Sequence, residues 1–163
     1  MITADELRDI LSYDPDTGIF RWRRKISKKT VVGRAAGSLS NGYSVIAIHK
    51  RDYRAHHLAF LYMKGRWPET DEVDHKNTVR SDNSWDNLRE ATRLQNSGNT
   101  RRPRHNKSGV KGVYWDASRQ KWHAQISVND RSTTLGRFMS IQDAQAAYEQ
   151  AATARFGEFA RME

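Results

Sequence analysis

A basic tract without periodicity, near the middle of the chain, sets the strongest limit on the fold. Residues 100–109 read TRRPRHNKSG and contain a Pro, a Gly and no repeating apolar position. Such a segment is typical of a linker rather than of a helix or a strand. The 163 residues are therefore divided into two short stretches, each with its own small core, to which five Trp, six Tyr and five Phe contribute bulk. We predict two domains, 1–99 and 108–163, joined by a linker at 100–107.

The charge of the chain indicates a polyanionic partner. Its formal net charge is +9, and Lys and Arg release counterions when they contact phosphates, which favours nucleic acid. No apolar run is long enough to span a bilayer, and the basic residues do not follow an amphipathic helix, so a membrane surface is the weaker alternative. The absence of cysteine excludes disulfides and thiolate zinc sites. The N-terminus lacks the pattern of a signal peptide, and we expect a cytoplasmic, intracellular protein.

Residues 72–96 contain the pattern strand, loop, strand, helix. Asp74 and His75 end the first strand, 76–84 is a polar loop, and Leu88 and Ala91 flank a short return strand. The segment Thr92-Arg93-Leu94-Gln95 is a capping box, so a helix begins there. The first turn of that helix contains Asn96, which we expect to face the hairpin. The pattern predicts that Asp74, His75 and Asn96 converge.

These residue types suit hydrolysis of a phosphodiester. The carboxylate of Asp74 and the amide oxygen of Asn96 can hold Mg²⁺, which keeps several waters and binds substrate phosphate. The imidazole of His75 can deprotonate the attacking water, because its pKa lies near neutrality. We expect Asn87 to hydrogen-bond backbone groups of the loop and thereby to fix the direction of His75.

Each of these residues also has a simpler interpretation. An Asp-His pair on a strand is commonly a polar surface pair, and Asn87 and Asn96 can be a turn former and a local cap. Their order and spacing in one hairpin-helix frame of a strongly basic chain favour the nuclease. The pair His56 and His57, at a helix start, is interpreted as structural and is left out of the catalytic set.

Several motifs between residues 56 and 99 occur together in one known family. They are His57-Leu58-Ala59-Phe60, Trp67-Pro68, Val73-Asp74-His75, Asn83, Asn87-Leu88-Arg89 and Thr92-Arg93-Leu94-Gln95-Asn96. In these motifs the segment resembles the HNH (ββα-metal) nucleases, in the branch found among phage and intron homing endonucleases. The resemblance implies His75 as general base, Asp74 and Asn96 as metal ligands, and Asn87 as the Asn that braces the loop. Many members have His where Asn96 stands. An amide suits Mg²⁺ better than transition metals, so we expect Mg²⁺, with Mn²⁺ as the alternative.

Three strand-like segments and one helix follow the linker. The strands are predicted at 110–115, 122–128 and 132–138, with Asn129-Asp130 as the turn between the last two. The segment 140–143 is a capping box that starts a helix. The fold class is therefore α+β, with the nuclease unit followed by a three-stranded antiparallel sheet packed on one helix.

The C-terminal motifs also match a known class of DNA-binding domain. They include Gly112-Val113, Lys121-Trp122-His123-Ala124-Gln125-Ile126, Leu135-Gly136-Arg137-Phe138 and Ala147-Tyr148. In these the unit resembles the ethylene-response-factor (Apetala-two) domains, whose sheet lies in the major groove of DNA. The predicted DNA-binding residues, including those of the linker, are Arg101, Arg102, Arg104, Lys107, Lys111, Tyr114, Trp115, Arg119, Lys121, Trp122, Gln125, Arg131 and Arg137. Trp115 and Trp122 can equally be core residues beneath the helix, and the linker can equally be a plain solubilising segment.

Together these patterns predict a metal-dependent DNA endonuclease with sequence-biased binding through its C-terminal sheet. The partner is double-stranded DNA, bound by a monomer or by a dimer. The combination resembles free-standing homing endonucleases of phages, and by that resemblance the products carry 5′-phosphate and 3′-hydroxyl ends. The alternatives are a non-catalytic, regulatory DNA-binding protein and an RNA-binding protein.

Overall fold

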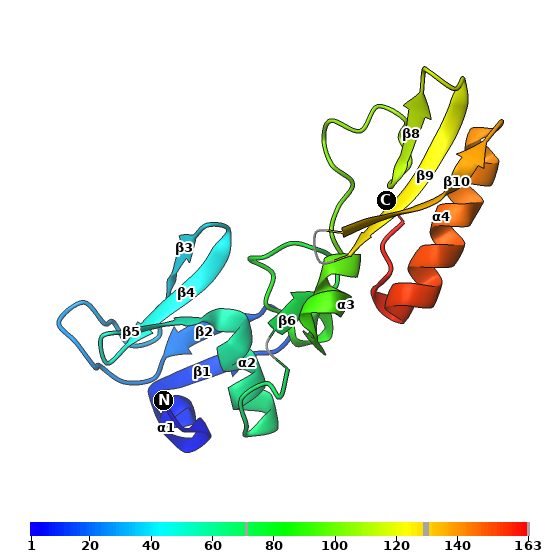
Figure 1. Ribbon diagram of the computed structural model, residues 1–163. Coiled ribbons are helices and arrows are strands. Elements are labelled where there is room, and N and C mark those ends of the chain that lie inside the picture. Colours follow the sequence, from blue (N-terminus) through cyan, green and yellow to red (C-terminus); the bar gives the residue numbers. More distant parts are fainter. Residues whose placement is uncertain (71, 129–130, 163) are drawn as a thin grey trace. The chain divides into compact units, whose positions relative to one another are not determined.

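A computed structural model describes residues 1–70, 72–128 and 131–162 of the chain (Figure 1). It forms two compact units, Met1–Ala91 and Thr92–Glu163, each of which is described by itself. The predicted α+β class is confirmed, because helices accompany several small antiparallel sheets. The helix at Arg93–Gly98 and its N-cap Thr92 group with the second unit, whereas the sequence pattern placed them in the first domain. In the part of the chain that the structure describes, no helix is long and apolar enough to cross a membrane.

The first unit begins with a helix and two small antiparallel sheets. Helix α1 (Ala4–Ile10) starts at Thr3, whose hydroxyl accepts a hydrogen bond from the Glu6 amide. Strands β1 (Leu11–Asp14) and β2 (Ile19–Trp22) then pair as a hairpin. A second sheet contains β3 (Ser38–Ser40), β4 (Tyr43–Ile48) and β5 (Arg51–Arg54), in that order. The turn between β3 and β4 has positive φ at both Asn41 and Gly42, which suits a tight hairpin.

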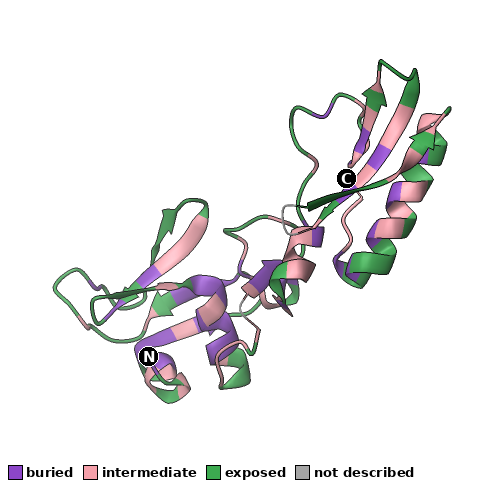
Figure 2. Ribbon diagram, viewed as in Figure 1, coloured by how far each residue is buried: buried purple, intermediate pink, exposed green. Residues whose placement is uncertain are grey.

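Helix α2 (Ala55–Lys64) supplies much of the core of the first unit. It ends, as predicted, at Gly65, whose φ of 72° is the left-handed conformation that glycine adopts without steric cost. The largest apolar side chains that become fully buried in this unit come from α1, the two sheets and α2 (Figure 2): Leu7, Ile10, Leu11, Phe20, Ile46, Ile48 and Leu58. Burial of such a side chain contributes about 1.5–3 kcal/mol, so this small core holds α2 against the sheets.

The predicted hairpin at residues 72–91 is confirmed. Strand β6 (Glu72–His75) pairs with β7 (Leu88–Ala91), and the register sets His75 opposite Leu88. A short 3₁₀ turn, η1 (Trp85–Asn87), leads into β7. The intervening loop rests on the turn between β1 and β2. At Gly18 an added Cβ would lie 2.2 Å from the carbonyl carbon of Asn83, so only glycine allows this close approach.

The second unit contains a three-stranded sheet and two helices. Helix α3 (Arg93–Gly98) begins at the predicted capping box, in which the Thr92 and Gln95 side chains each bond the other's backbone amide. The sheet has the order β10-β9-β8, built from β8 (Val113–Asp116), β9 (Lys121–Val128) and β10 (Arg131–Phe138). Helix α4 (Ile141–Phe156), capped by Ser140, packs on all three strands and is followed by η2 (Gly157–Phe159). The predicted Asn129-Asp130 turn lies outside the described residues.

The first strand of this sheet begins three residues later than predicted. Gly112 adopts a φ of 72°, and the Asn106 side chain donates to the carbonyls of Val110 and Val113, so residues 106–112 form a fixed loop. Ala144, Tyr148, Ala152 and Phe156 recur every four residues along α4 and are buried. They cover the buried strand residues Val113, Ala124 and Ile126. The predicted sheet packed on one helix is therefore present.

Candidate active site

His75 is held in place by a buried hydrogen bond to Asn83. The His75 Nε2 atom lies 3.2 Å from Asn83 Oδ1, and Asn83 Nδ2 donates to the Ser81 carbonyl at 3.1 Å. Because the second bond assigns the amide nitrogen to Ser81, the atom facing His75 is an oxygen, which can only accept. The hydrogen therefore sits on Nε2, and in the neutral ring Nδ1 is the basic nitrogen.

The surroundings of His75 keep its ring neutral at pH 7. Burial lowers the pKa of His75 below its ordinary value of 6.5, and the bond to Asn83 offsets part of that shift. The ring of His56, whose pKa burial lowers to about 2, meets His75 edge-on with centroids 4.9 Å apart. His57 lies against His56 at 4.5 Å, and burial lowers its pKa too. The structure thus places His56 directly against His75 and His57 against His56, although both were interpreted as structural from the sequence.

His56 is buried, with 2% of its surface exposed, and its Nδ1 atom has no hydrogen-bond partner among the described residues. Such an atom in an apolar setting favours the uncharged ring, in agreement with its lowered pKa. The ring of His56 therefore packs against His75 as a neutral aromatic wall and adds no charge.

Asp74 forms a buried ion pair with Arg89 across the hairpin. The two residues are register partners, and Arg89 Nε lies 2.9 Å from Asp74 Oδ2. The Asp74 side chain is only 4% exposed and the Arg89 side chain 16%, so water screens the pair little. The guanidinium compensates the cost of burying the carboxylate and fixes its orientation next to His75.

Asn87 braces the loop as the sequence predicts. Its Oδ1 accepts from the Asn77 amide at 3.0 Å, and its Nδ2 donates to the Asp82 carbonyl at 2.8 Å. The backbone carbonyl of Asn87 also accepts from the Lys76 amide, directly after His75. These bonds confirm the predicted contacts with loop backbone. The catalytic consequence of Asn87 stays a prediction.

The predicted metal ligands are compatible with a magnesium ion. Asp74 supplies a carboxylate in the first unit. Asn96 lies half-buried in the first turn of α3, in the second unit, so its convergence with Asp74 stays a prediction. No cluster of three or more His, Asp or Glu that could hold a metal occurs among residues 1–70, 72–128 and 131–162. Mg²⁺ needs no such cluster, because it is bound through one or two carboxylates and completes its shell with water and phosphate.

Two arginines near His75 were not predicted from the sequence. The guanidinium carbons of Arg54 and Arg80 lie 4.7 Å and 5.0 Å from the centre of the Tyr43 ring, which is itself 6.2 Å from the His75 ring. Both arginines are exposed. Tyr43 belongs to β4 and Arg54 precedes α2, so no sequence spacing relates them to His75. Together they form a basic rim around the histidine.

In the second unit, most of the predicted DNA-binding residues of the strands share one face of the sheet. Strand register sets Tyr114 and Arg137 on either side of His123, and Lys121 opposite Asp116. Alternation then gives the face opposite α4 the following side chains: Tyr114, Asp116, Lys121, His123, Gln125, Ser127, Ser132, Thr134 and Arg137. We call these nine residues the polar face. Arg119 reaches Asp116 from the turn between β8 and β9.

The two tryptophans lie on the other side of this sheet. Trp115 pairs with Trp122, their ring centroids are 5.1 Å apart, and alternation sets them on the same side as Val113 and Ala124, which face α4. Trp122 is half-buried, while Trp115 is 47% exposed at the end of β8. Arg131, exposed at the start of β10, pairs with Val128 and does not belong to the polar face. These positions favour the core interpretation for Trp122, whereas Trp115 remains exposed.

Lys111 is a structural residue of the second unit. Only 8% of it is exposed, and its ammonium donates to the carbonyls of Gly98, Thr100 and Arg161. Burial lowers the pKa of Lys111 to about 8, so the group is still charged at neutral pH. An ammonium engaged by three carbonyls has no hydrogen left for a phosphate, which argues against the predicted DNA contact.

The linker residues show a mixture of roles. Arg104 and Lys107 are exposed, as is Arg101, which has a partner of its own. Arg102 is half-buried and donates through Nη1 to the Asn106 carbonyl at 3.0 Å. Residues 103–106 also close a backbone turn. Exposed basic side chains on a partly fixed segment remain suited to contacts with phosphates.

Known proteins support the nuclease interpretation of this part of the chain. The family model described as HNH endonuclease matches residues 53–97, a range that contains Asp74, His75, Asn87 and Asn96. Protein 3.8 of Escherichia phage T7 is 29% identical over 86 residues, which cover 51% of this chain and 71% of that protein. No solved structure matches the chain. The chain thus contains an HNH endonuclease domain at 53–97, and the homing type and the ethylene-response-factor resemblance stay predictions.

Proposed function

We propose that the chain is a metal-dependent endonuclease that hydrolyses phosphodiester bonds in double-stranded DNA. The observation that carries the proposal is the geometry of His75, which lies next to a buried carboxylate inside an HNH endonuclease domain. Its hydrogen bond to Asn83 leaves Nδ1 as the proton acceptor. A neutral, directed imidazole is the form that a general base requires.

In this mechanism each residue has one task. Nδ1 of His75 takes the proton of the attacking water, while Asn83 holds Nε2 and keeps the tautomer. Asp74 and Asn96 would hold Mg²⁺, or Mn²⁺, and the bound ion would supply positive charge to stabilise the phosphate and the leaving oxygen. Asn87 keeps the loop after His75 in shape, and the products carry 5′-phosphate and 3′-hydroxyl ends.

The second unit is proposed to anchor the protein on DNA, as a monomer or a dimer. Its polar face offers Lys121 and Arg137, and the exposed linker residues add positive charge next to the sheet. Antiparallel strands are known to enter DNA grooves, and phosphate contacts set the register of such a sheet. The sequence bias and the relation to phage homing endonucleases belong to this proposal.

The test is cleavage of supercoiled plasmid by the full chain, in Mg²⁺ and in EDTA. Wild-type protein is compared with His75→Ala and with His49→Ala, which removes an exposed histidine of the same unit that pairs with Glu6. We expect metal-dependent nicking, a loss of about 10²-fold or more for His75→Ala, and no loss for His49→Ala. Binding to the plasmid should persist in His75→Ala.

Two outcomes would contradict the proposal. Cleavage that survives in His75→Ala removes His75 from the role of base. Salt-sensitive binding without cleavage of any DNA tested, including the DNA that flanks the chain's own gene, supports the non-catalytic regulatory protein instead. Preference for structured RNA over duplex DNA in competition would support an RNA-binding protein.

A further inference from the structure

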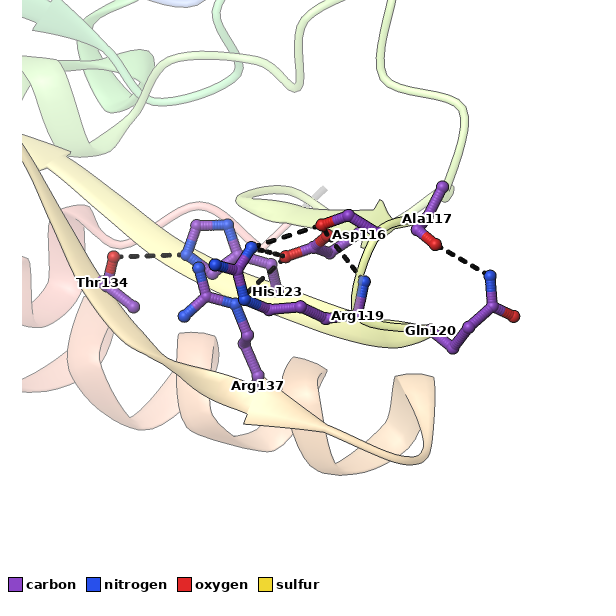
Figure 3. A network of polar contacts seen from close by, with 8 residues as sticks. Asp116, Ala117, Arg119, Gln120, His123, Thr134 and Arg137 are labelled. Carbon is purple, nitrogen blue, oxygen red and sulfur yellow. Dashed lines mark hydrogen bonds and ion pairs between the residues drawn. The ribbon is translucent and has the colours of Figure 1, made fainter.

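Asp116 lies on the polar face among basic side chains. A carboxylate there would repel DNA unless its charge were balanced by neighbouring cations. Its Oδ2 accepts from Arg137 Nε at 3.1 Å and from Arg119 Nη1 at 3.3 Å, and its Oδ1 accepts from Ser118 (Figure 3). The hydrogen bond from the Ser118 hydroxyl, followed by that from the Arg137 guanidinium, holds the pKa of Asp116 well below the usual range, and Arg119 adds a smaller contribution.

The two arginines meet Asp116 through different atoms. Arg119 uses Nη1, which also contacts the Ser118 hydroxyl at 3.3 Å, so one end of its terminal fork is occupied within the turn. Arg137 uses Nε, the nitrogen at the side of the guanidinium. Among the described residues, no hydrogen bond or ion pair engages its Nη1 or Nη2. The Nη1 and Nη2 donors of Arg137 are therefore available to a further acceptor.

A bulge in β10 aims Arg137 at this face. Thr134 pairs with Gln125 and Gly136 pairs with Ala124, so Leu135 is an extra residue in the strand. Without that extra residue, alternation would turn Arg137 toward α4. Gly136 makes the bulge possible, because an added Cβ would come 2.8 Å from the Phe138 ring. The orientation of the Arg137 side chain is thus set twice, by the bulge in the backbone and by the ion pair with Asp116.

We propose that Arg137, positioned by Asp116, recognises a guanine base. This role rests on the proposed binding of duplex DNA by the second unit. Arg137 presents Nη1 and Nη2 to the O6 and N7 acceptors of a guanine in the major groove, the pairing that best matches its planar fork. Asp116 is a positioning residue, which removes the rotational freedom of Arg137 before DNA binds. Arg119 contributes charge toward phosphates and carries no base preference.

The neighbours of Arg137 fit this role. The register sets His123 directly beside Arg137 on the central strand, and the His123 ring is held by Thr134 at 3.2 Å. Beyond it on β8 lies Tyr114. His123 and Tyr114 therefore lie in one row with Arg137 across the three strands, and Figure 3 draws His123 and Arg137 on neighbouring strands.

The experiment is selection of bound sequences from a random duplex library by the full chain, in EDTA so that cleavage plays no part. Wild-type protein is compared with Arg137→Lys, Asp116→Asn and the matched control Arg155→Ala, which removes an exposed arginine of α4. We expect one guanine position to be preferred by wild type and Arg155→Ala, about 10- to 100-fold over other bases. Arg137→Lys should lose that preference, and Asp116→Asn should reduce it by about fivefold or more at nearly unchanged binding to unrelated DNA.

Replacing the selected guanine by 7-deazaguanine separates base reading from phosphate binding. The replacement should weaken wild type and leave Arg137→Lys unaffected. If Arg137→Lys and Arg137→Ala instead weaken all sequences alike and no variant changes a base preference, the pair is a structural ion pair and the inference fails while the nuclease stands. If the wild type binds no duplex at all, both the proposed function and this inference fail. Circular dichroism shows whether each variant is folded.

Discussion

In the first unit the polar groups closest to His75 are buried and held by hydrogen bonds or ion pairs, whereas the polar face of the second unit is largely open to water. Asp74 is 4% exposed and paired with Arg89, and His75 is tied to Asn83, which is itself 2% exposed. On the polar face, Arg137 is 37% exposed although it is paired with Asp116. The same chemical groups are thus used in two different environments.

The difference indicates a division of labour. A buried polar group keeps a single orientation, because separation from its partner would leave it desolvated without a hydrogen bond. Proton transfer requires such a fixed orientation. An exposed group interacts weakly with its neighbours, is screened by salt, and remains able to exchange a protein partner for a phosphate or a base. Removal of a partner should therefore be costly in the first unit and mild on the polar face.

The largest expected effect is the loss of the buried ion pair of Asp74. Arg89→Met should lower the free energy of unfolding by about 3 kcal/mol or more, because a buried carboxylate loses its counter-charge. The matched control is Arg66→Met, which removes the more exposed pair with Glu90 on the same hairpin and should cost much less. Urea denaturation measures both. Equal losses for the two variants would show that burial does not distinguish the pairs.

The second expected effect is on the rate of cleavage. Asn83→Ala removes the acceptor that fixes the tautomer of His75, so we expect single-turnover cleavage to fall by about 10²-fold with little change in DNA binding. The control Asn77→Ala removes an exposed Asn of the same loop, whose Nδ2 binds Asp82. A rate for Asn83→Ala that equals the rate for Asn77→Ala would mean that Asn83 does not direct His75.

Local signals in the sequence predicted most of the fold. The capping box of Thr92 and Gln95, the glycine stop after α2 and the hairpin at 72–91 are set by residues close together in the chain, and all are confirmed. The start of β8 was wrong by three residues, because the Asn106 side chain binds the carbonyls of Val110 and Val113 and fixes a loop there. No periodicity records such a side chain-to-backbone bond.

The site was predictable only along one hairpin. Asp74, His75 and Asn87 lie within residues 72–91, so their pattern was visible, and the bonds of Asn87 to the loop are confirmed. Tyr43 and His56 reach His75 from other elements, which a sequence spacing does not reveal. For Lys111 the charge suggested a DNA contact, and the three carbonyls that surround its ammonium in the fold argue against that contact.

Lys111 allows the comparison of buried with exposed polar groups to be tested inside the second unit, because it is a buried polar group there. Lys111→Met keeps the length of the side chain and leaves three carbonyls without their donor, so we expect a loss of about 2 kcal/mol in stability. The slope of DNA affinity against salt concentration should not change. A slope reduced by about one, with stability unchanged, would instead make Lys111 a phosphate contact.

The smallest expected effect concerns the exposed arginines near His75, which resemble the polar face in exposure although they belong to the first unit. Arg54 and Arg80 lie over Tyr43, and each should contact phosphates that flank the cleaved bond. We expect Arg80→Ala to raise KM about two- to fivefold, with kcat nearly unchanged, because it removes a contact made equally in the ground and transition states. The control Arg51→Ala, exposed on the same sheet, should leave KM unchanged. A fall in kcat for Arg80→Ala, at constant KM, would instead give this exposed arginine a part in the chemistry, and exposure would no longer separate binding residues from catalytic ones.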